Sequence, residues 1–199
     1  MTVLVDYQLR SLISNGRLKV IPLMEGGIQS NSIDIRLNDN FAMYDATYGT
    51  VELDPYSEVS TRLGLQHVTT ERILLCKGAF LLAETMEHIE LPDDICATME
   101  GKSSLARLGL TVHQTGGWID CGFEGTLTLE MTNENVRPIV LTAGMPICQL
   151  VFHETKPAET SYNRKKTAKY MKQQGATGSR FYENEKEGTK QVDRESEDH

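Results

Sequence analysis

The sequence has 199 residues, of which 39% are hydrophobic, so it is long enough for one domain with a real core. Its formal net charge of −8 argues against broad affinity for nucleic acid or for an anionic membrane, although a local basic site could still bind a small anion. No run approaches the roughly 18 apolar residues that cross a bilayer, and the first residues lack the basic and apolar regions of a signal peptide.

The first predicted element is a short helix over residues 6–15, which Asp6 can cap and Gly16 can end. After it the pattern is mainly β, in short strands separated by turn-like stretches such as 38–40. The predicted strands are 33–37, 51–53, 71–76, 79–86, 126–132, 138–142 and 146–152. Many short strands with little helix favour a barrel or a sandwich.

Residues 183–199 differ from the rest of the chain, because they contain seven acids, three bases and a single valine. This composition cannot bury a core, so we expect a disordered acidic tail, and a solvated terminus is favoured over a binding tail. The sequence therefore predicts one domain over 1–182 followed by this tail.

The four cysteines are widely separated, and none lies in CxxC spacing. In a chain of this size they indicate reduced thiols and a cytoplasmic protein. The histidines are scattered as well, so a structural zinc site has little support. The cysteines are Cys76, Cys96, Cys121 and Cys148.

Residues 101–109, GKSSLARLG, predict a loop that runs into one short helix closed by Gly109. Ser103 and Ser104 would lie at the start of that helix, where free backbone N–H groups and the helix dipole favour an anion. Lys102 and Arg107 add cationic donors that suit phosphate. A capped surface helix is the simpler interpretation of the same residues, and the spacing is not that of a Walker A loop.

Residues 115–125, TGGWIDCGFEG, combine four glycines with the carboxylate of Asp120. Glycines allow tight turns and a close approach of the backbone to a ligand. Asp120 could bind a sugar hydroxyl or orient a water molecule. A glycine-rich turn with a capping aspartate explains the pattern equally well.

Residues 126–132, TLTLEMT, alternate strictly between apolar and polar side chains. The apolar set would point into a core, which leaves Thr128 and Glu130 together on the opposite face. A carboxylate in the middle of a strand is a candidate for a raised pKa and for proton transfer. A solvent-facing strand residue is the alternative.

Taken together, these segments resemble the dCTP deaminase family, which is related to the trimeric dUTPases. The family's G-[RK]-S-S-L-[AG]-R motif appears at 101–107, its H-x-T-x-x-x-I-D stretch at 113–120, and its L-E strand end at 129–130. Residues 32–37, SIDIRL, are similar to an early strand of the family, and 161–180 to its C-terminal segment that covers the nucleotide. The resemblance runs in order from about residue 4 to residue 182.

The resemblance implies a distorted β-barrel or jelly-roll-like subunit of the dUTPase type, with short helices. It also implies a homotrimer with active sites between subunits, dCTP or dUTP as ligand, Mg²⁺ carried by the triphosphate and no zinc. We therefore expect neither the H-x-E nor the P-C-x-x-C element of the zinc deaminases.

Residue roles are carried over by position. Glu130 would be the acid/base of deamination, with Ser103, Arg107 and Asp120 as the other catalytic residues. His113 and Gln114 would take part in regulation, with dTTP as a feedback inhibitor. The nucleotide-binding residues would be Lys102, Ser103, Ser104, Leu105, Ala106, Arg107, Asp120, Thr128, Leu129, Glu130, Gln149, Tyr162, Lys169 and Gln173.

The product of the reaction is indicated by residues 115–120, TGGWID, which resemble the T-A-G-[WF]-I-D form of bifunctional members that also cleave the triphosphate. Gln149 matches the same members, whereas Gly116 and Cys148 depart from their pattern. We therefore expect dUMP, ammonia and pyrophosphate. The alternatives are a deaminase that releases dUTP, a dUTPase without deamination, and a nucleotide-binding regulator.

Overall fold

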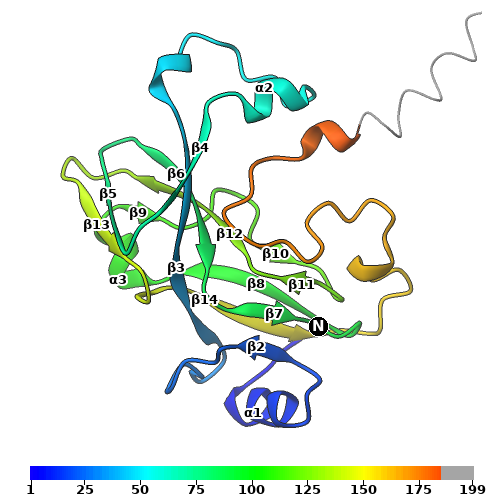
Figure 1. Ribbon diagram of the computed structural model, residues 1–199. Coiled ribbons are helices and arrows are strands. Elements are labelled where there is room, and N and C mark those ends of the chain that lie inside the picture. Colours follow the sequence, from blue (N-terminus) through cyan, green and yellow to red (C-terminus); the bar gives the residue numbers. More distant parts are fainter. Residues whose placement is uncertain (185–199) are drawn as a thin grey trace, which may run out of the picture.

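The computed structural model describes residues 1–184, so most of the predicted acidic tail, 185–199, lies outside the described residues (Figure 1). Its helices are short: α1 (Asp6–Ser14), α2 (Glu58–Arg62) and α3 (Ser103–Ala106), with 3-10 turns at Ala46–Tyr48, Tyr162–Arg164 and Phe181–Asn184. Its strands are β1 (Thr2–Val3), β2 (Lys19–Ile21), β3 (Ile33–Tyr44), β4 (Leu65–Thr69), β5 (Arg72–Leu75), β6 (Phe80–Thr85), β7 (His88–Glu90), β8 (Ile95–Gly101), β9 (Leu110–Thr111), β10 (Trp118–Ile119), β11 (Glu124–Gly125), β12 (Thr128–Asn133), β13 (Ile139–Thr142) and β14 (Pro146–Glu154). The prediction of a mainly β fold is confirmed.

The strands form one large antiparallel sheet and two small ones. The large sheet has the order β10-β8-β14-β3-β6-β12-β9, with β1 added at β14 and β4 at β3. The small sheets are β11-β7-β2 and β13-β5. The long strand β3 joins the two halves of the large sheet, since it pairs with β14 through its first residues and with β6 and β4 through its last (Figure 1).

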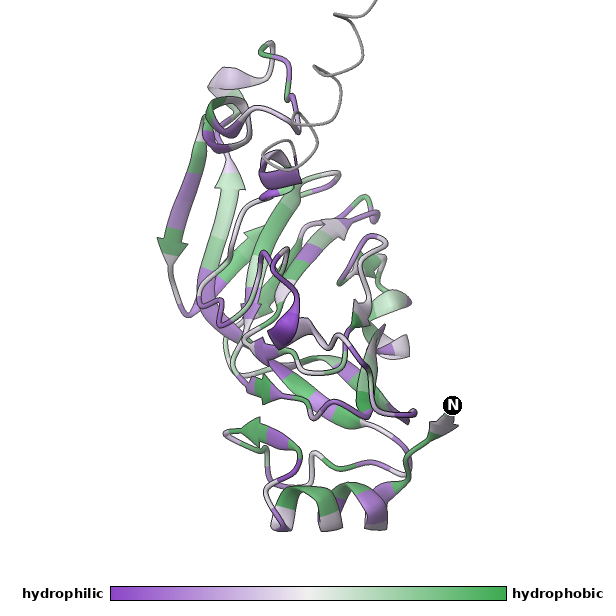
Figure 2. Cartoon of the chain, turned by 90° about the vertical axis from the view of Figure 1, so that its right-hand side faces the viewer, coloured by the Kyte–Doolittle hydropathy of each residue, from purple (hydrophilic) through white to green (hydrophobic). Residues whose placement is uncertain are grey.

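The hydrophobic core lies between the sheets and follows the alternation of side chains along each strand. Leu129 and Met131 of β12 are fully buried, as are Leu150 and Phe152 of β14. Figure 2 shows the same pattern, with hydrophobic and hydrophilic residues alternating along the strands. The predicted orientation of 126–132 is therefore confirmed, because its apolar side chains point inward.

Three local predictions are wrong. Residues 38–40 do not form a turn between strands, because β3 continues to Tyr44 with only a register shift between Leu37 and Phe41. Residues 51–53 form no strand, because they pair with no other strand and Val51 is exposed. The strand in this region is β4, which the sequence pattern did not indicate.

The third error concerns the start of α1. Val5 is the N-cap residue, and Asp6 already lies in the first turn, where its carboxylate pairs with Arg10 at 2.6 Å. The predicted end is confirmed, since Gly16 has a φ of +75°. No helix within residues 1–184 combines the length and the apolar character needed to cross a membrane.

Candidate active site

A cavity of about 590 Å³ opens beside β12 and collects residues from distant parts of the chain. Its walls come from β6, β12, the loop around β10, and the C-terminal segment that returns over the sheet (Figure 1). Five of the predicted site residues line it: Asp120, Thr128, Glu130, Tyr162 and Gln173. Aromatic side chains that the sequence analysis did not assign line it as well, among them Trp118, Phe123 and Tyr170.

Glu130 projects from the middle of β12 into this cavity beside Thr128, as the strand alternation predicts. The side chain is half-buried. Burial raises the pKa of the Glu130 carboxyl above its usual range, while the backbone N–H of Gln114 and the nearby His113 oppose that shift. A carboxyl group whose pKa is raised in this way keeps its proton to higher pH than a free carboxyl does, which suits a group that must both accept and return a proton.

Asp120 follows β10 directly and is held by two neighbours. The indole Nε1 of Trp118 donates to its Oδ1 at 3.1 Å, and Lys165 Nζ lies 2.5 Å from its Oδ2. Sequence reasoning missed Lys165. It lies in the segment that resembles the family, but that segment holds several cationic residues, and only the folded chain selects the one that reaches Asp120.

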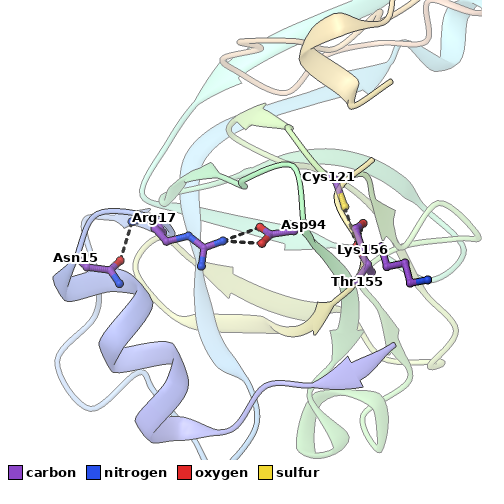
Figure 3. Close-up of polar contacts among 6 residues, drawn as sticks. All are labelled: Asn15, Arg17, Asp94, Cys121, Thr155 and Lys156. Atoms are coloured by element: carbon purple, nitrogen blue, oxygen red, sulfur yellow. Dashed lines mark hydrogen bonds and ion pairs between the residues drawn. The ribbon is translucent and has the colours of Figure 1, made fainter. Parts of the chain in front are cut away.

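Contacts of the turn at 92–94 and of Cys121 support the loop that follows Asp120, and Figure 3 draws those of Asp94 and Cys121. Arg17 donates to both carboxylate oxygens of Asp94, at 2.8 and 2.6 Å, and Gly122 N–H donates to the carbonyl of Pro92 at 3.1 Å. Cys121 Sγ lies 3.7 Å from Thr155 Oγ1. These contacts tie the end of the N-terminal helix to the wall that carries Asp120.

The C-terminal segment closes the cavity from one side. Gln173 donates from Nε2 to the carbonyl of Thr126 at 2.8 Å, and its Oε1 is buried without a hydrogen-bond partner among the described residues. The hydroxyl of Tyr162 accepts from the backbone N–H of Tyr170 at 3.0 Å. Lys169, which was predicted to join this group, does not line the cavity, and its Nζ lies 5.6 Å from the ring centre of Phe181.

The predicted anion-binding residues form a second, separate group around α3. Lys102 Nζ pairs with Asp34 at 2.7 Å, whereas Ser103, Ser104 and Arg107 are exposed. Leu105 is half-buried and Ala106 exposed, and no residue of 102–107 lines the cavity that holds Glu130. The helix is a single turn, so its dipole contributes less than a longer helix would.

Gln149 and Leu129 also contact no part of the cavity with their side chains. Gln149 Oε1 accepts from Ser32 Oγ at 3.0 Å, on the strand pair β14 and β3. The side chain of Leu129 is fully buried in the core, so a nucleotide could reach only its backbone. The structure therefore gathers one half of the predicted site and leaves the other half elsewhere on the same chain.

The two adjacent glycines of the loop have different surroundings. A Cβ on Gly117 would meet the Met99 carbonyl at 3.1 Å and His113 Cε1 at 3.2 Å, so a larger residue here would require these neighbours to shift. A Cβ on Gly116 would meet nothing within 4 Å. Gly116, where the family pattern has alanine, is thus not required by sterics.

One trio of potential metal ligands occurs within residues 1–184, but it does not line the cavity. Ligand atoms of His88, Glu90 and Glu124 lie within 4.8 Å of one another. Both carboxylates already have cationic partners, Lys19 at 2.7 Å and Lys172 at 3.6 Å. The expectation that the H-x-E element is absent is wrong, because His88 and Glu90 have that spacing. The cysteine pair that completes the site of a zinc deaminase is missing from the sequence.

Comparison with known proteins defines the class. The model of the dCTP deaminase-like family matches residues 3–155, so the chain belongs to this family, as the motifs predicted. In fold, the chain is similar to the crystal structure of 2'-deoxycytidine 5'-triphosphate deaminase from Agrobacterium tumefaciens. The TM-score is 0.60 at 26% identity, over 77% of this chain and 48% of that longer chain.

Within the family, two curated relatives share about half of their residues with this chain. "dCTP deaminase, dUMP-forming" of Methanoculleus marisnigri is 53% identical over 182 residues, which cover 92% of this chain and 96% of that protein. The protein of the same name from Methanospirillum hungatei is 53% identical over 184 residues, covering 92% and 98%. The similarity extends over nearly the whole of each chain.

Proposed function

We propose that this protein deaminates dCTP at cytosine C4 and cleaves the triphosphate, which gives dUMP, ammonia and pyrophosphate. The observation that carries the proposal is Glu130, a half-buried carboxyl with a raised pKa that faces a cavity of nucleotide size. The names of the two relatives, both dUMP-forming deaminases, support the same reaction. Such an enzyme supplies dUMP for dTMP synthesis.

In the deamination step, water adds to C4 of the cytosine ring and ammonia leaves. Glu130 takes a proton from the attacking water and delivers it to the ring nitrogen N3, where it remains in the uracil product. It then takes the proton of the new C4 hydroxyl and delivers it to the amino group, which leaves as ammonia while the C4 carbonyl forms. Thr128, beside it on β12, faces the same cavity and is placed to contact the pyrimidine. Tyr162 and Gln173 close the cavity, and the Oε1 of Gln173, which has no hydrogen-bond partner within residues 1–184, offers an acceptor for a nucleotide donor.

We place the triphosphate on the α3 group of a neighbouring subunit in a homotrimer. Ser103, Ser104 and Arg107 are exposed, and no residue of 102–107 lines the cavity of its own chain, as expected for a site shared between subunits. Lys102, Ser103 and Arg107 supply cationic and hydroxyl donors that suit phosphate oxygens. Gln149 and Lys169 belong to the same proposal as further nucleotide contacts.

In the cleavage step, Asp120 orients a water molecule at the α-phosphate, and Lys165 keeps that carboxylate in place. Mg²⁺ would be held by the phosphates and by water rather than by a protein side chain, because both carboxylate oxygens of Asp120 already have partners in Trp118 and Lys165. When bound, the ion would neutralise charge on the triphosphate. Zinc has no role in this proposal.

Regulation by dTTP would act through His113 and Gln114. Burial raises the pKa of the Glu130 carboxyl, whereas the backbone N–H of Gln114 and the nearby His113 lower it, so a shift of this loop would change the catalytic group directly. Competition of dTTP with dCTP binding, measured by calorimetry with wild-type protein, tests this part. Equal affinity for dCTP with and without dTTP would contradict it.

We further propose that residues 1–182 form the functional domain of a cytoplasmic enzyme. Tyr182 supports this boundary, because it is buried and its hydroxyl accepts from Arg62 at 3.0 Å.

The test of the reaction is incubation with labelled dCTP and Mg²⁺, with separation of the nucleotides at early times. We expect ammonia, dUMP and pyrophosphate to appear in equal amounts. A stable accumulation of dUTP without pyrophosphate would favour the deaminase that stops at dUTP. Hydrolysis of added dUTP without any ammonia from dCTP would favour a dUTPase.

A further inference from the structure

A second buried carboxylate lies behind the cavity, on the neighbouring strand β6. Glu84 is only 3% exposed and does not line the cavity. Within residues 1–184 no lysine or arginine forms an ion pair with it. A buried carboxylate without a cation is costly unless hydrogen-bond donors replace its water shell. The donors that surround Glu84 therefore identify its role.

Four donors converge on this carboxylate from three directions. Oε2 accepts from the amides of Asn38 and Asn40, both at 2.9 Å. Oε1 accepts from the hydroxyl of Thr126 at 2.7 Å and from the backbone N–H of Gly175 at 2.5 Å. Asn38 and Asn40 belong to β3, Thr126 precedes β12, and Gly175 belongs to the C-terminal segment.

Residues 173–177 of the C-terminal segment form a strap that is bound to the sheet at three points. At one end, the carbonyl of Gln173 accepts from the backbone N–H of Thr126 at 3.1 Å. At the other end, the N–H of Thr177 donates to the hydroxyl of Thr128 at 3.2 Å. Glu84 holds the middle of the strap through Gly175, between these two ends.

The attachment matters for the cavity because Gln173 and Thr177 both line it, whereas Gly175 does not. The register β6–β12 pairs Glu84 with Thr128, two residues before Glu130. The height of the strap above the carboxyl of Glu130 is therefore fixed by a bond to the adjacent strand of the same sheet.

We propose that Glu84 is a positioning residue, which holds the strap over the cavity by accepting from Gly175 while Asn38, Asn40 and Thr126 hold its carboxylate in place. It acts on the nucleotide only through Gln173 and Thr177. The expected effect of Glu84 on nucleotide binding rests on the proposed function, whereas its expected effect on the order of residues 173–177 does not.

The first experiment is hydrogen exchange of the protein without nucleotide, for wild type and Glu84→Gln. The amide of glutamine brings two donors to a position where four donors already meet, so at least one bond is lost. We expect the peptides that cover 173–177 to exchange about tenfold faster, because local opening of the strap becomes easier, while peptides from β12 keep their protection.

The matched control is Glu87→Gln. Glu87 is also fully buried, but it accepts from the backbone and the guanidinium of Arg36, at 2.8 and 2.7 Å, and makes no contact with the strap. In the Glu87→Gln variant, the peptides that cover 173–177 should exchange at the wild-type rate. Unchanged exchange of 173–177 in a folded Glu84→Gln variant, or equal acceleration in both variants, would overturn the assignment.

If Glu84→Gln does not fold, Thr126→Val decides instead. Valine keeps the shape of threonine and removes only the hydroxyl that donates to Glu84 and to the Gln173 carbonyl. Faster exchange confined to the strap supports the proposal, and wild-type exchange there refutes it.

The second experiment measures steady-state kinetics with dCTP. We expect Glu84→Gln to raise KM about tenfold while kcat changes less than about threefold, since the strap contributes binding rather than proton transfer. A purely structural defect would instead lower the active fraction, and therefore kcat, without changing KM. If the wild-type protein showed no deaminase activity, the proposed function would be refuted. The role of Glu84 would then be tested by the hydrogen-exchange experiment alone.

Discussion

The cavity beside β12 and the loop around α3 contain the two halves of the proposed site, and their environments differ sharply. In the cavity, Glu130 is half-buried and Asp120 is held by Trp118 and Lys165. Around α3, by contrast, Ser103 and Arg107 are exposed. The difference teaches that a single chain gathers the residues proposed for proton transfer, whereas the residues proposed for the triphosphate face outward.

Environment also explains the chemistry assigned to each half. Burial strengthens electrostatic effects and raises the pKa of Glu130, which is useful for proton transfer. Phosphate recognition needs fixed positive charge and hydroxyl donors, and these tolerate solvent until the ligand arrives. The two halves can therefore be separated experimentally.

The largest expected effect is at the centre of the cavity. Glu130→Gln keeps the shape of the side chain and removes its titration, so ammonia release from dCTP should fall by at least about 100-fold. The control is Glu134→Gln, at an exposed carboxylate just after the same strand, which should keep wild-type activity. Near-normal ammonia release by Glu130→Gln would break the assignment of this half as the catalytic one.

The second test asks whether Ser103 and Glu130 of one site come from different subunits. Ser103→Ala and Glu130→Gln chains, each inactive alone, are mixed under conditions that exchange subunits. If Ser103 and Glu130 of one site come from different chains, about a quarter of the sites regain both groups after random mixing. No recovery after verified exchange would place both residues in one chain, and a monomer by light scattering would refute the trimer itself.

A smaller effect is expected when the ion pair between Lys165 and Asp120 is removed. Lys165→Met removes the ammonium group that pairs with Asp120, and kcat/KM for dCTP should fall roughly tenfold because the carboxylate loses its fixed position. The neighbouring Lys166 is exposed, so Lys166→Met serves as the control for lost surface charge. Equal effects of both substitutions would mean that only net charge matters.

The glycine pair gives a smaller and more local contrast. Gly116→Ala should change thermal stability and product ratio little, since its Cβ meets open space. Gly117→Ala should cost about 1–3 kcal/mol of unfolding free energy, because its Cβ presses on Met99 and His113. Chemical denaturation of both variants checks this order, and a more damaging Gly116→Ala would contradict it.

The smallest effect is the pH dependence of stability. Burial raises the pKa of Glu130 in the folded chain, so the folded state keeps this proton to higher pH than the unfolded state does. The free energy of unfolding should therefore fall as pH rises from the unfolded pKa through the folded one. The Glu130→Gln variant has no carboxyl at this position, so it does not lose this stability as pH rises. The Tm of the variant minus the Tm of wild type should therefore be larger at neutral pH than at pH 4. A constant difference would argue against the raised pKa.

The sequence by itself determined the mainly β class, the family, and the face of 126–132 that carries Glu130. The last of these follows from geometry, since side chains along a strand point to alternate sides whatever lies around them. Local spacing was thus sufficient wherever the relevant interaction is between near neighbours or built into the backbone.

Only the tertiary structure decided which lysine meets Asp120, why 38–40 continue a strand, and which donors surround Glu84. Asn38 and Asn40 favour a turn by local preference, yet their amides donate to a carboxylate more than forty positions away. Lys165 reaches Asp120 across 45 positions, and Gly175 reaches Glu84 across 91. Such contacts depend on how strands and loops meet in space, which no local pattern encodes, because a side chain's partner is fixed by the packing of the whole sheet.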